Sequence, residues 1–415
     1  MSIGDDIEAC HEGDTDSFTD SQFLFRAYLF PFTYLFGIIS NTINIIVFSQ
    51  KPMRYQPVNW FFLALSVSDL MTLVSSFFVF SVPVYAENSH DAVLIEYSVH
   101  LIVLFYPLAQ TGLTMSVYVT ILVSVHRYLG VCHPFLIRRI SNSSAVKTVI
   151  VAAVAFAFSF NISRWFELHA QPCFSKNYNQ NSSMIYPTPL MINNIYTLVY
   201  RNAAYTIIMF FLPFTILTYV NLRIIATLQQ SYKMRREMAN VRSKRDSTVP
   251  AETIITKLEG YAPITSIETN CSNNERKENG VTIMLVAITT EFLLFNLLAF
   301  ANNIIELSNK RFFQEIETLL VELSTFLVNV NGASTIIVYL IFGSKYRNVF
   351  IRLLRVYLGI NLCKGDKRSM YASQAHFETT QLLDNTSRLE RYKSSVKRTD
   401  MSSFRNSSRR ARTPI

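Results

Sequence analysis

Long apolar stretches recur along the chain, separated by short polar connections. A helix needs about 20 mostly apolar residues to cross a lipid bilayer. Seven stretches are long and apolar enough, and each is therefore predicted to be a membrane-spanning helix. They cover 27–49, 59–84, 101–128, 146–165, 203–227, 281–304 and 317–342.

The composition agrees with this pattern. Half of the 415 residues are hydrophobic and 16% are charged, whereas a soluble domain carries about a quarter charged residues. The other interpretation is a soluble helical bundle with a large core, and seven long apolar stretches argue against it. The sequence therefore predicts an all-α fold, a seven-transmembrane helix bundle in the lipid bilayer.

Charged residues are distributed unevenly between the two sides of the predicted bundle. The connections after the first and third stretches carry Lys and Arg without acids, whereas the connection after the second carries only acids. Because positively charged loops stay in the cytoplasm, we expect a multi-pass plasma-membrane protein with its N-terminus outside and its C-terminus inside. The net charge of +9 then reflects topology, and no nucleic-acid partner is needed to explain it.

The same pattern divides the chain into regions. We expect an acidic extracellular arm over 1–26 and a membrane domain over 27–342, with a third cytoplasmic loop over 228–280. Residues 343–360 are predicted to form a basic amphipathic helix on the inner membrane surface. The polar remainder, 361–415, is predicted to be a disordered cytoplasmic tail.

Three motifs in the second, third and fourth stretches are similar to those of a known family. The second stretch contains LALSVSDL, the third ends in HRYLGVCHPF, and the fourth ends in FNISRWFE. Together they resemble the rhodopsin-like G-protein-coupled receptors. The motif FNISRWFE resembles invertebrate FMRFamide-type neuropeptide receptors in particular, and the resemblance covers roughly 25–360.

The resemblance implies a receptor that activates a heterotrimeric G protein at its cytoplasmic face. Arrestin and receptor kinases would act on the tail. No enzyme is expected, because the sequence contains no HExxH motif, no glycine-rich phosphate loop and no plausible catalytic triad. The residues implied in G-protein coupling are His126, Arg127, Tyr128, Pro134, Phe135 and Tyr339.

Several motif positions depart from the family pattern. In the seventh stretch the family motif Asn-Pro-x-x-Tyr becomes Thr335-Ile336-Ile337-Val338-Tyr339, so its proline is lost. His126 replaces the acid that pairs with the arginine in the resting state, so we expect a weak resting lock and basal activity. The sixth stretch has Phe295-Asn296-Leu297-Leu298 where the family has Cys-Trp-x-Pro. The same stretch carries Glu291, which we expect to be a protonated structural residue.

The resemblance also implies a sodium site inside the bundle. Oxygen ligands suit a hard cation, and the matching positions are Asp69, Ser116, Asn331 and Thr335. The alternative is that Asp69 is protonated and only hydrogen-bonded to these neighbours. No other cofactor is expected.

The predicted outer face is acidic, which suits a cationic ligand. FMRFamide-like peptides end in Arg-Phe-amide and would need a carboxylate together with an aromatic pocket. The candidate ligand-binding residues are three acids and three aromatic residues, Glu167, Glu306, Glu322, Phe105, Tyr106 and Trp165.

Two of the five cysteines, Cys10 and Cys173, lie on the predicted outer side. The family's usual disulfide joins the second extracellular loop to the start of the third helix, where this chain has Ile102. Cys10 and Cys173 are therefore either bridged to each other or both free.

Two modification sites are expected. Asn181 begins a glycosylation sequon in the second extracellular loop. Cys363 follows the amphipathic helix and is a candidate for palmitoylation.

Two other functions stay open. A receptor of the same fold could sense small environmental molecules, and the lost tryptophan and prolines favour this alternative. A transporter or channel is a possibility from another class, but such proteins show internal repeats and Gly/Pro-interrupted helices, and this chain shows neither.

Overall fold

The computed structural model describes Cys10 and residues 18–140, 142–175, 180–246, 265–307 and 314–358. Residues 1–350 form one unit and residues 351–415 another, and the bundle described below belongs to the first. Cys363 lies outside the described residues.

Seven helices in the described part of the chain are long and apolar enough to cross a membrane. The prediction of a seven-helix bundle is therefore confirmed. Each predicted stretch matches one of these helices, and most helices extend several residues beyond the apolar stretch. They cover Asp20–Phe48, Val58–Ser89, Ala92–Cys132, Ser143–Phe166, Asn194–Met234, Gly280–Ile305 and Ile316–Phe342.

Several of these spans are built from more than one helical segment. The first comprises α1 (Asp20–Phe23), η1 (Leu24–Leu29) and α2 (Phe30–Phe48); the second comprises α4 (Val58–Ser76), η2 (Phe77–Ser81) and α5 (Val82–Ser89). The third is α6 (Ala92–Cys132), and the fourth joins α8 (Ser143–Asn161) to η3 (Ile162–Phe166). The fifth comprises α10 (Asn194–Tyr196), η4 (Thr197–Ala204), η5 (Ile207–Phe211) and α11 (Leu212–Asp246); the sixth and seventh are α12 (Thr265–Leu307) and α13 (Gln314–Phe342).

Four of the segments, η1, η2, η4 and η5, are π-helical. Such wide turns are rare and occur frequently at functional sites. Shorter helices connect or follow the spans: α3 (Lys51–Arg54), α7 (Pro134–Ile140), α9 (Pro189–Ile192) and α14 (Ser344–Leu358).

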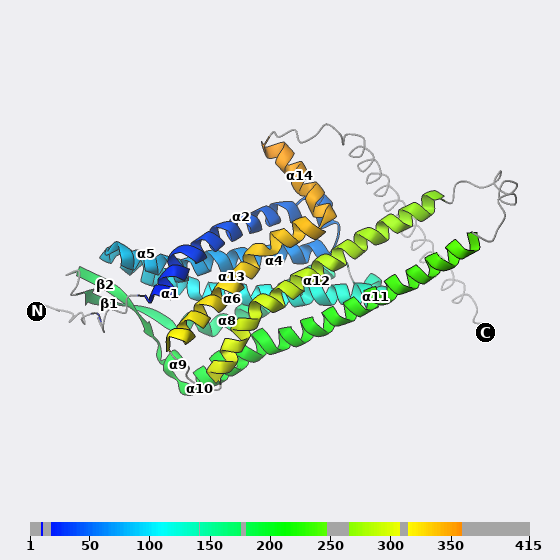
Figure 1. The fold of residues 1–415 in the computed structure, drawn as a ribbon. Helices are drawn as coiled ribbons and strands as arrows, with labels where there is room; N and C mark the ends of the chain where they lie inside the picture. The colour runs from blue at the N-terminus through cyan, green and yellow to red at the C-terminus, as the bar shows by residue number, and fades with distance from the viewer. Residues whose placement is uncertain are drawn as a thin grey trace, which may run out of the picture. The chain divides into compact units, whose positions relative to one another are not determined.

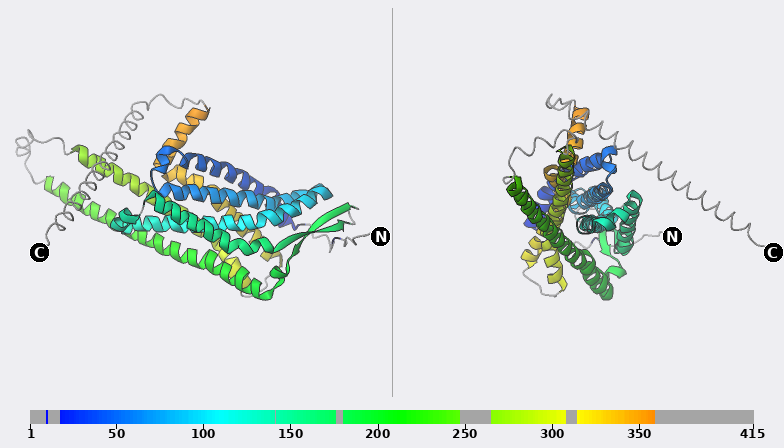
Figure 2. Two further views of the ribbon diagram at one scale, coloured as in Figure 1. Left: turned by 180° about the vertical axis from the view of Figure 1, so that it is seen from behind. Right: turned by 90° about the vertical axis from the view of Figure 1, so that its right-hand side faces the viewer.

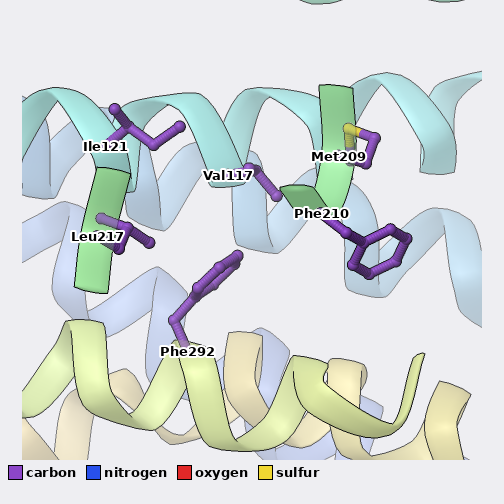
Figure 3. Close-up of a cluster of buried hydrophobic side chains, with 6 residues drawn as sticks. All are labelled: Val117, Ile121, Met209, Phe210, Leu217 and Phe292. Atoms are coloured by element: carbon purple, nitrogen blue, oxygen red, sulfur yellow. The ribbon is translucent and has the colours of Figure 1, made fainter. Parts of the chain in front are cut away.

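Helix α6 lies at the centre of the bundle, where it packs against α4, α8 and α11 (Figure 1, Figure 2). Helix α13 packs against α2 and α12. A cluster of buried apolar side chains joins α6 to the fifth and sixth spans (Figure 3). It comprises Val117, Ile121, Met209, Phe210, Leu217 and Phe292.

A β-hairpin stands at one end of the bundle, which we call the hairpin end (Figure 1). Strands β1 (Leu168–Ser175) and β2 (Gln180–Pro187) pair antiparallel, with Leu168 opposite Pro187 and Ser175 opposite Gln180. The sequence pattern predicted only helices, so this prediction of an all-α fold is incomplete at the hairpin. Strands of eight residues between two spans give a weak hydrophobic pattern beside 20-residue apolar stretches.

The opposite end, which we call the Arg127 end, is extended by the long helices α11 and α12. The sequence pattern predicted a cytoplasmic loop over 228–280, but α12 already begins at Thr265. Residues 265–279 contain no proline, so the backbone can continue the helix without losing a hydrogen bond.

The first turn of α14 is anchored to the bundle by Tyr346. Burial raises the pKa of its hydroxyl above the ordinary value, so the group stays protonated. It donates a hydrogen bond of 2.6 Å to Asn44 Oδ1 in α2. Arg347 donates to the carbonyl oxygens of Leu340 and Ile341 and thereby satisfies the last turn of α13.

Candidate functional site

A cavity of about 310 Å³ lies in the half of the bundle nearer the hairpin end. Five spans contribute to it: the second, third, fifth, sixth and seventh. Three of its aromatic lining residues are Phe80 in η2, Tyr205 after η4 and Phe210 in η5. Two of the four π-helical segments, η2 and η5, thus contribute to the cavity wall. Its polar lining residues include Gln110, Asn296, Asn302, Asn303, Asn329 and Glu317.

The four asparagines in the lining can both accept and donate further hydrogen bonds. Each side chain donates one amide N–H to a backbone carbonyl oxygen, at 2.8 to 2.9 Å. Each amide also carries the oxygen Oδ1, which accepts, and a second N–H, which donates. The cavity therefore suits a polar ligand group.

Glu317, in the first turns of α13, is the one acid among the described residues that line the cavity. Its side chain is exposed, so the carboxylate is accessible to a ligand. Neither Glu317 nor the asparagines were among the predicted ligand-binding residues. The adjacent Asn302 and Asn303 in an apolar span were a signal that could have indicated them.

The predicted acid Glu167 is buried under the hairpin and already has partners. Its carboxylate lies 3.3 Å from Arg164 Nη1 and accepts hydrogen bonds from Tyr106 at 3.0 Å and Tyr196 at 2.7 Å. Arg164 also donates to the Tyr106 hydroxyl at 2.8 Å. Glu167 and Tyr106 thus form part of a closed internal network and do not line the cavity.

Glu322, Phe105 and Trp165 also lie outside the cavity lining. Glu322 pairs with Arg26 at 2.5 Å. Phe105 stacks on Phe78 with ring centroids 4.3 Å apart, and Trp165 is 39% exposed. Glu306 belongs to α12, but its side chain is outside the described part of the structure.

The residues of the predicted sodium site meet between α4, α6 and α13. Ser116 donates a hydrogen bond of 2.6 Å to Asp69 Oδ1. Asp69, Ser116 and Asn331 line a small cavity of about 10 Å³ together with Gly332. The second oxygen of Asp69, Oδ2, is buried and accepts no hydrogen bond from the described residues. Thr335 is buried as well, but it does not line this cavity.

These residues fit a small hard cation. An acceptor oxygen that is buried without a hydrogen-bond donor is unfavourable unless a cation or water satisfies it. A side chain at Gly332 would narrow the space, since a Cβ there would lie 3.7 Å from Asp69 Cγ.

The residues predicted to act in G-protein coupling include His126 and Tyr128, which lie at the Arg127 end. The His126 ring packs 5.5 Å from the Phe61 ring of α4. Tyr128 contacts His133 and Tyr219 through ring contacts at 5.5 and 6.2 Å.

Two further residues predicted to act in coupling, Phe135 and Tyr339, differ sharply in exposure. Pro134 begins α7, and its neighbour Phe135 is 87% exposed. Tyr339 is fully buried, and its ring packs on Phe48 and Phe62. Phe135 is therefore accessible at the surface of the described structure, and Tyr339 is not.

Cys10 and Cys173 form a disulfide. The backbone N–H of Cys10 also donates to the Phe174 carbonyl oxygen at 3.0 Å, so the N-terminal segment is joined to β1. Asn181 lies on β2, and its side chain is not among those described.

The amino-acid sequence of this chain matches the sequence model of a known protein family. A sequence model described as "7 transmembrane receptor (rhodopsin family)" matches residues 40–334. The chain belongs to this family. It is thus a multi-pass membrane protein of a receptor family, and the resemblance noted from the motifs is confirmed.

Individual relatives agree with this assignment. The chain is 23% identical over 317 residues to the FMRFamide receptor of Drosophila melanogaster, covering 76% of this chain and 51% of that receptor. It is 25% identical over 329 residues to an FMRFamide peptide receptor of Caenorhabditis elegans, covering 77% and 67%. A probable G-protein coupled receptor of the same nematode is 25% identical over 346 residues, covering 80% and 78%. The chain spans about half the length of the Drosophila relative.

Proposed function

We propose that this receptor responds to an extracellular, amidated FMRFamide-like neuropeptide and activates a heterotrimeric G protein. The observation that carries the proposal is the cavity lined by aromatic residues, four asparagines and the exposed acid Glu317. Two of the relatives are named as FMRFamide receptors, which supports the ligand class.

The chemistry of an Arg-Phe-amide end matches the lining of the cavity. A guanidinium carries five N–H donors and no acceptor, so it suits the asparagine oxygens and the Glu317 carboxylate. The phenylalanine ring can pack against Phe80, Tyr205 and Phe210. A volume of about 310 Å³ is at the small end for ligand pockets, so only the last residues of the peptide enter.

The hairpin end faces the outside in this proposal. Disulfides persist in oxidising compartments, and Cys10–Cys173 lies at this end. The Arg127 end then faces the cytoplasm, where Arg127 and the exposed Phe135 meet the G protein. Receptor kinases and arrestin would act on the Ser/Thr-rich residues of 361–415.

The Asp69 site is proposed to hold an allosteric sodium ion. Asp69 Oδ2, the Ser116 hydroxyl and Asn331 would provide its ligands. Burial of these groups and the fit of oxygen donors to a hard cation support the proposal.

A receptor for small environmental molecules is the second candidate, and the modest cavity volume favours it. A transporter or channel receives no support from the family to which the chain belongs. A labelled FMRFamide peptide distinguishes the two receptor candidates directly, through its binding to purified receptor.

In that experiment Glu317→Gln is expected to weaken binding of the arginine peptide by about tenfold, the effect of one charge-assisted hydrogen bond. A peptide with citrulline in place of arginine should bind the wild-type receptor and the Glu317→Gln variant with equal affinity. Glu96→Gln removes an exposed acid of α6 outside the cavity and is the matched control. Unchanged binding by Glu317→Gln, or no peptide binding at all, would contradict the proposal.

A further inference from the structure

Arg26 forms an ion pair with Glu322 at the edge of the cavity. Its Nε and Nη2 atoms donate to the same carboxylate oxygen, Glu322 Oε1, at 2.9 and 2.5 Å. The Glu322 side chain is 3% exposed, whereas that of Arg26 is 20% exposed. The carboxylate is thus buried, and the arginine is partly open to solvent.

Two aromatic rings flank the Arg26 guanidinium. Its Cζ atom lies 5.5 Å from the centroid of the Phe18 ring and 5.4 Å from that of Phe80. Both distances are within the range of cation–π attraction. We call Glu322, Phe18 and Phe80 the arginine cage, because together they provide a carboxylate and two ring faces for one guanidinium.

The arginine cage is continuous with the cavity. Phe80 lines the cavity itself, and so do Val321 and Ser324 on either side of Glu322. A ligand in the cavity therefore lies next to the cage.

Only one of the two carboxylate oxygens of Glu322, Oε1, accepts hydrogen bonds from Arg26. Glu322 Oε2 is buried and accepts no hydrogen bond from the residues that the structure describes. An arginine and a carboxylate frequently pair through both oxygens in a fork-to-fork arrangement. Arg26 reaches only one of them, so the cage retains an acceptor for a second donor.

Arg164, another paired arginine at the same end, differs in this respect. Its side chain is 5% exposed and it contacts Tyr106 and Glu167, with its guanidinium over the rings of Tyr200 and Tyr205. Four partners and nearly complete burial hold Arg164 in place. Arg26 also makes two hydrogen bonds, but to a single polar partner, Glu322. It is more exposed, and it belongs to the π-helical segment η1 near the start of the first span.

We propose that the arginine cage is a guanidinium-recognition subsite beside the cavity, and that Arg26 is its resident occupant. A guanidinium-bearing ligand binds there by displacing Arg26. Only the identity of that ligand as a peptide rests on the proposed function; recognition of the guanidinium rests on the cage itself.

The test is chemical rescue of Arg26→Ala in the purified full chain. Argininamide supplies the missing guanidinium and should raise the melting temperature of this variant by several degrees, because ligand binding to the folded state stabilises it. Citrulline amide has nearly the same shape as argininamide but no charge, so it should not raise the melting temperature of this variant. Arg201→Ala, which removes an arginine of η4 outside the cage, is the matched control and should show no rescue.

A second variant distinguishes argininamide bound in the arginine cage from argininamide that stabilises the protein elsewhere. In Arg26→Ala/Glu322→Gln the carboxylate is lost, and argininamide should no longer stabilise the protein. Should Arg26→Ala not fold, Arg26→Gln retains a donor to Glu322, and the same difference between argininamide and citrulline amide is expected for it.

Equal melting temperatures with both compounds in the folded Arg26 variant, or equal rescue of Arg201→Ala, would overturn the proposal. The measurement uses neither peptide nor G protein. A receptor that ignores every Arg-Phe-amide peptide yet shows the rescue would therefore contradict the proposed function and leave the subsite standing.

Discussion

Arg164 and Glu167 form a buried ion pair beneath the hairpin, with Arg164 Nη1 3.3 Å from Glu167 Oε2. Breaking a buried pair from one side leaves an uncompensated charge, which typically lowers the free energy of unfolding by about 3–5 kcal/mol. Arg164→Ala should therefore lower the melting temperature and the amount of receptor at the cell surface. Thermal unfolding of the purified protein measures this.

Glu167→Gln tests the same network differently. It retains acceptor capacity for the Tyr106 and Tyr196 hydroxyls, so it should destabilise the protein less than Arg164→Ala does. A Glu167→Gln receptor with wild-type stability but greatly weakened peptide binding would show instead that Glu167 contacts the ligand.

The Cys10–Cys173 disulfide joins the N-terminal segment to β1. Cys10→Ser and Cys173→Ser each remove the same bond, so each should lower stability by a similar amount, in the usual range of about 2–4 kcal/mol. The double variant should be no less stable than the single ones. Additive losses in thermal unfolding would mean that the cysteines act separately.

Close helix packing depends on Gly37 in α2. A Cβ at this position would lie 2.5 Å from Leu73 Cδ1 and 2.9 Å from Ala333 Cβ, so Gly37→Ala should destabilise the bundle by about 1–3 kcal/mol. Gly130→Ala is the control, because a Cβ there meets no atom within 4 Å. Equal melting temperatures for the two variants would contradict this packing.

The proposed sodium site predicts a specific loss of salt dependence. Replacing NaCl by N-methylglucamine chloride should change the agonist affinity of the wild-type receptor, whereas Asp69→Asn should make the affinity independent of the cation. Competition binding in both salts measures this. A variant that keeps the sodium effect would place the ion elsewhere.

His126 replaces the acid that the family pairs with the neighbouring arginine, and here its ring packs against Phe61. His126→Asp supplies a carboxylate next to Arg127 and should lower basal G-protein activation severalfold. Nucleotide exchange without ligand is the measurement. Unchanged exchange, at equal surface expression, would show that His126 does not set the basal level.

The seven spans could be predicted from sequence because the thickness of the bilayer sets the length of a spanning helix at about 20 apolar residues. Recognising such a stretch needs no knowledge of tertiary contacts. The hairpin could not, since β1 and β2 are short and their pairing is a tertiary contact. The start of α12 at Thr265 was also missed, because its first residues are polar and have no apolar period to reveal a helix.

The candidate site was predictable only in part. Asp69 and Ser116 were placed together by the family motifs, and the structure has them hydrogen-bonded. The acids Glu167 and Glu322 were chosen for their charge, but sequence cannot show that Arg164 and Arg26 lie beside them. Glu317 was not chosen because its access to the cavity depends on how α12 and α13 pack.

The peptide-receptor function is best tested by G-protein activation in cells that express this chain, measured against a panel of amidated Arg-Phe peptides. We predict a concentration-dependent response that Arg127→Ala abolishes at unchanged surface expression. Silence towards every peptide, despite confirmed surface expression, would contradict the peptide-receptor function.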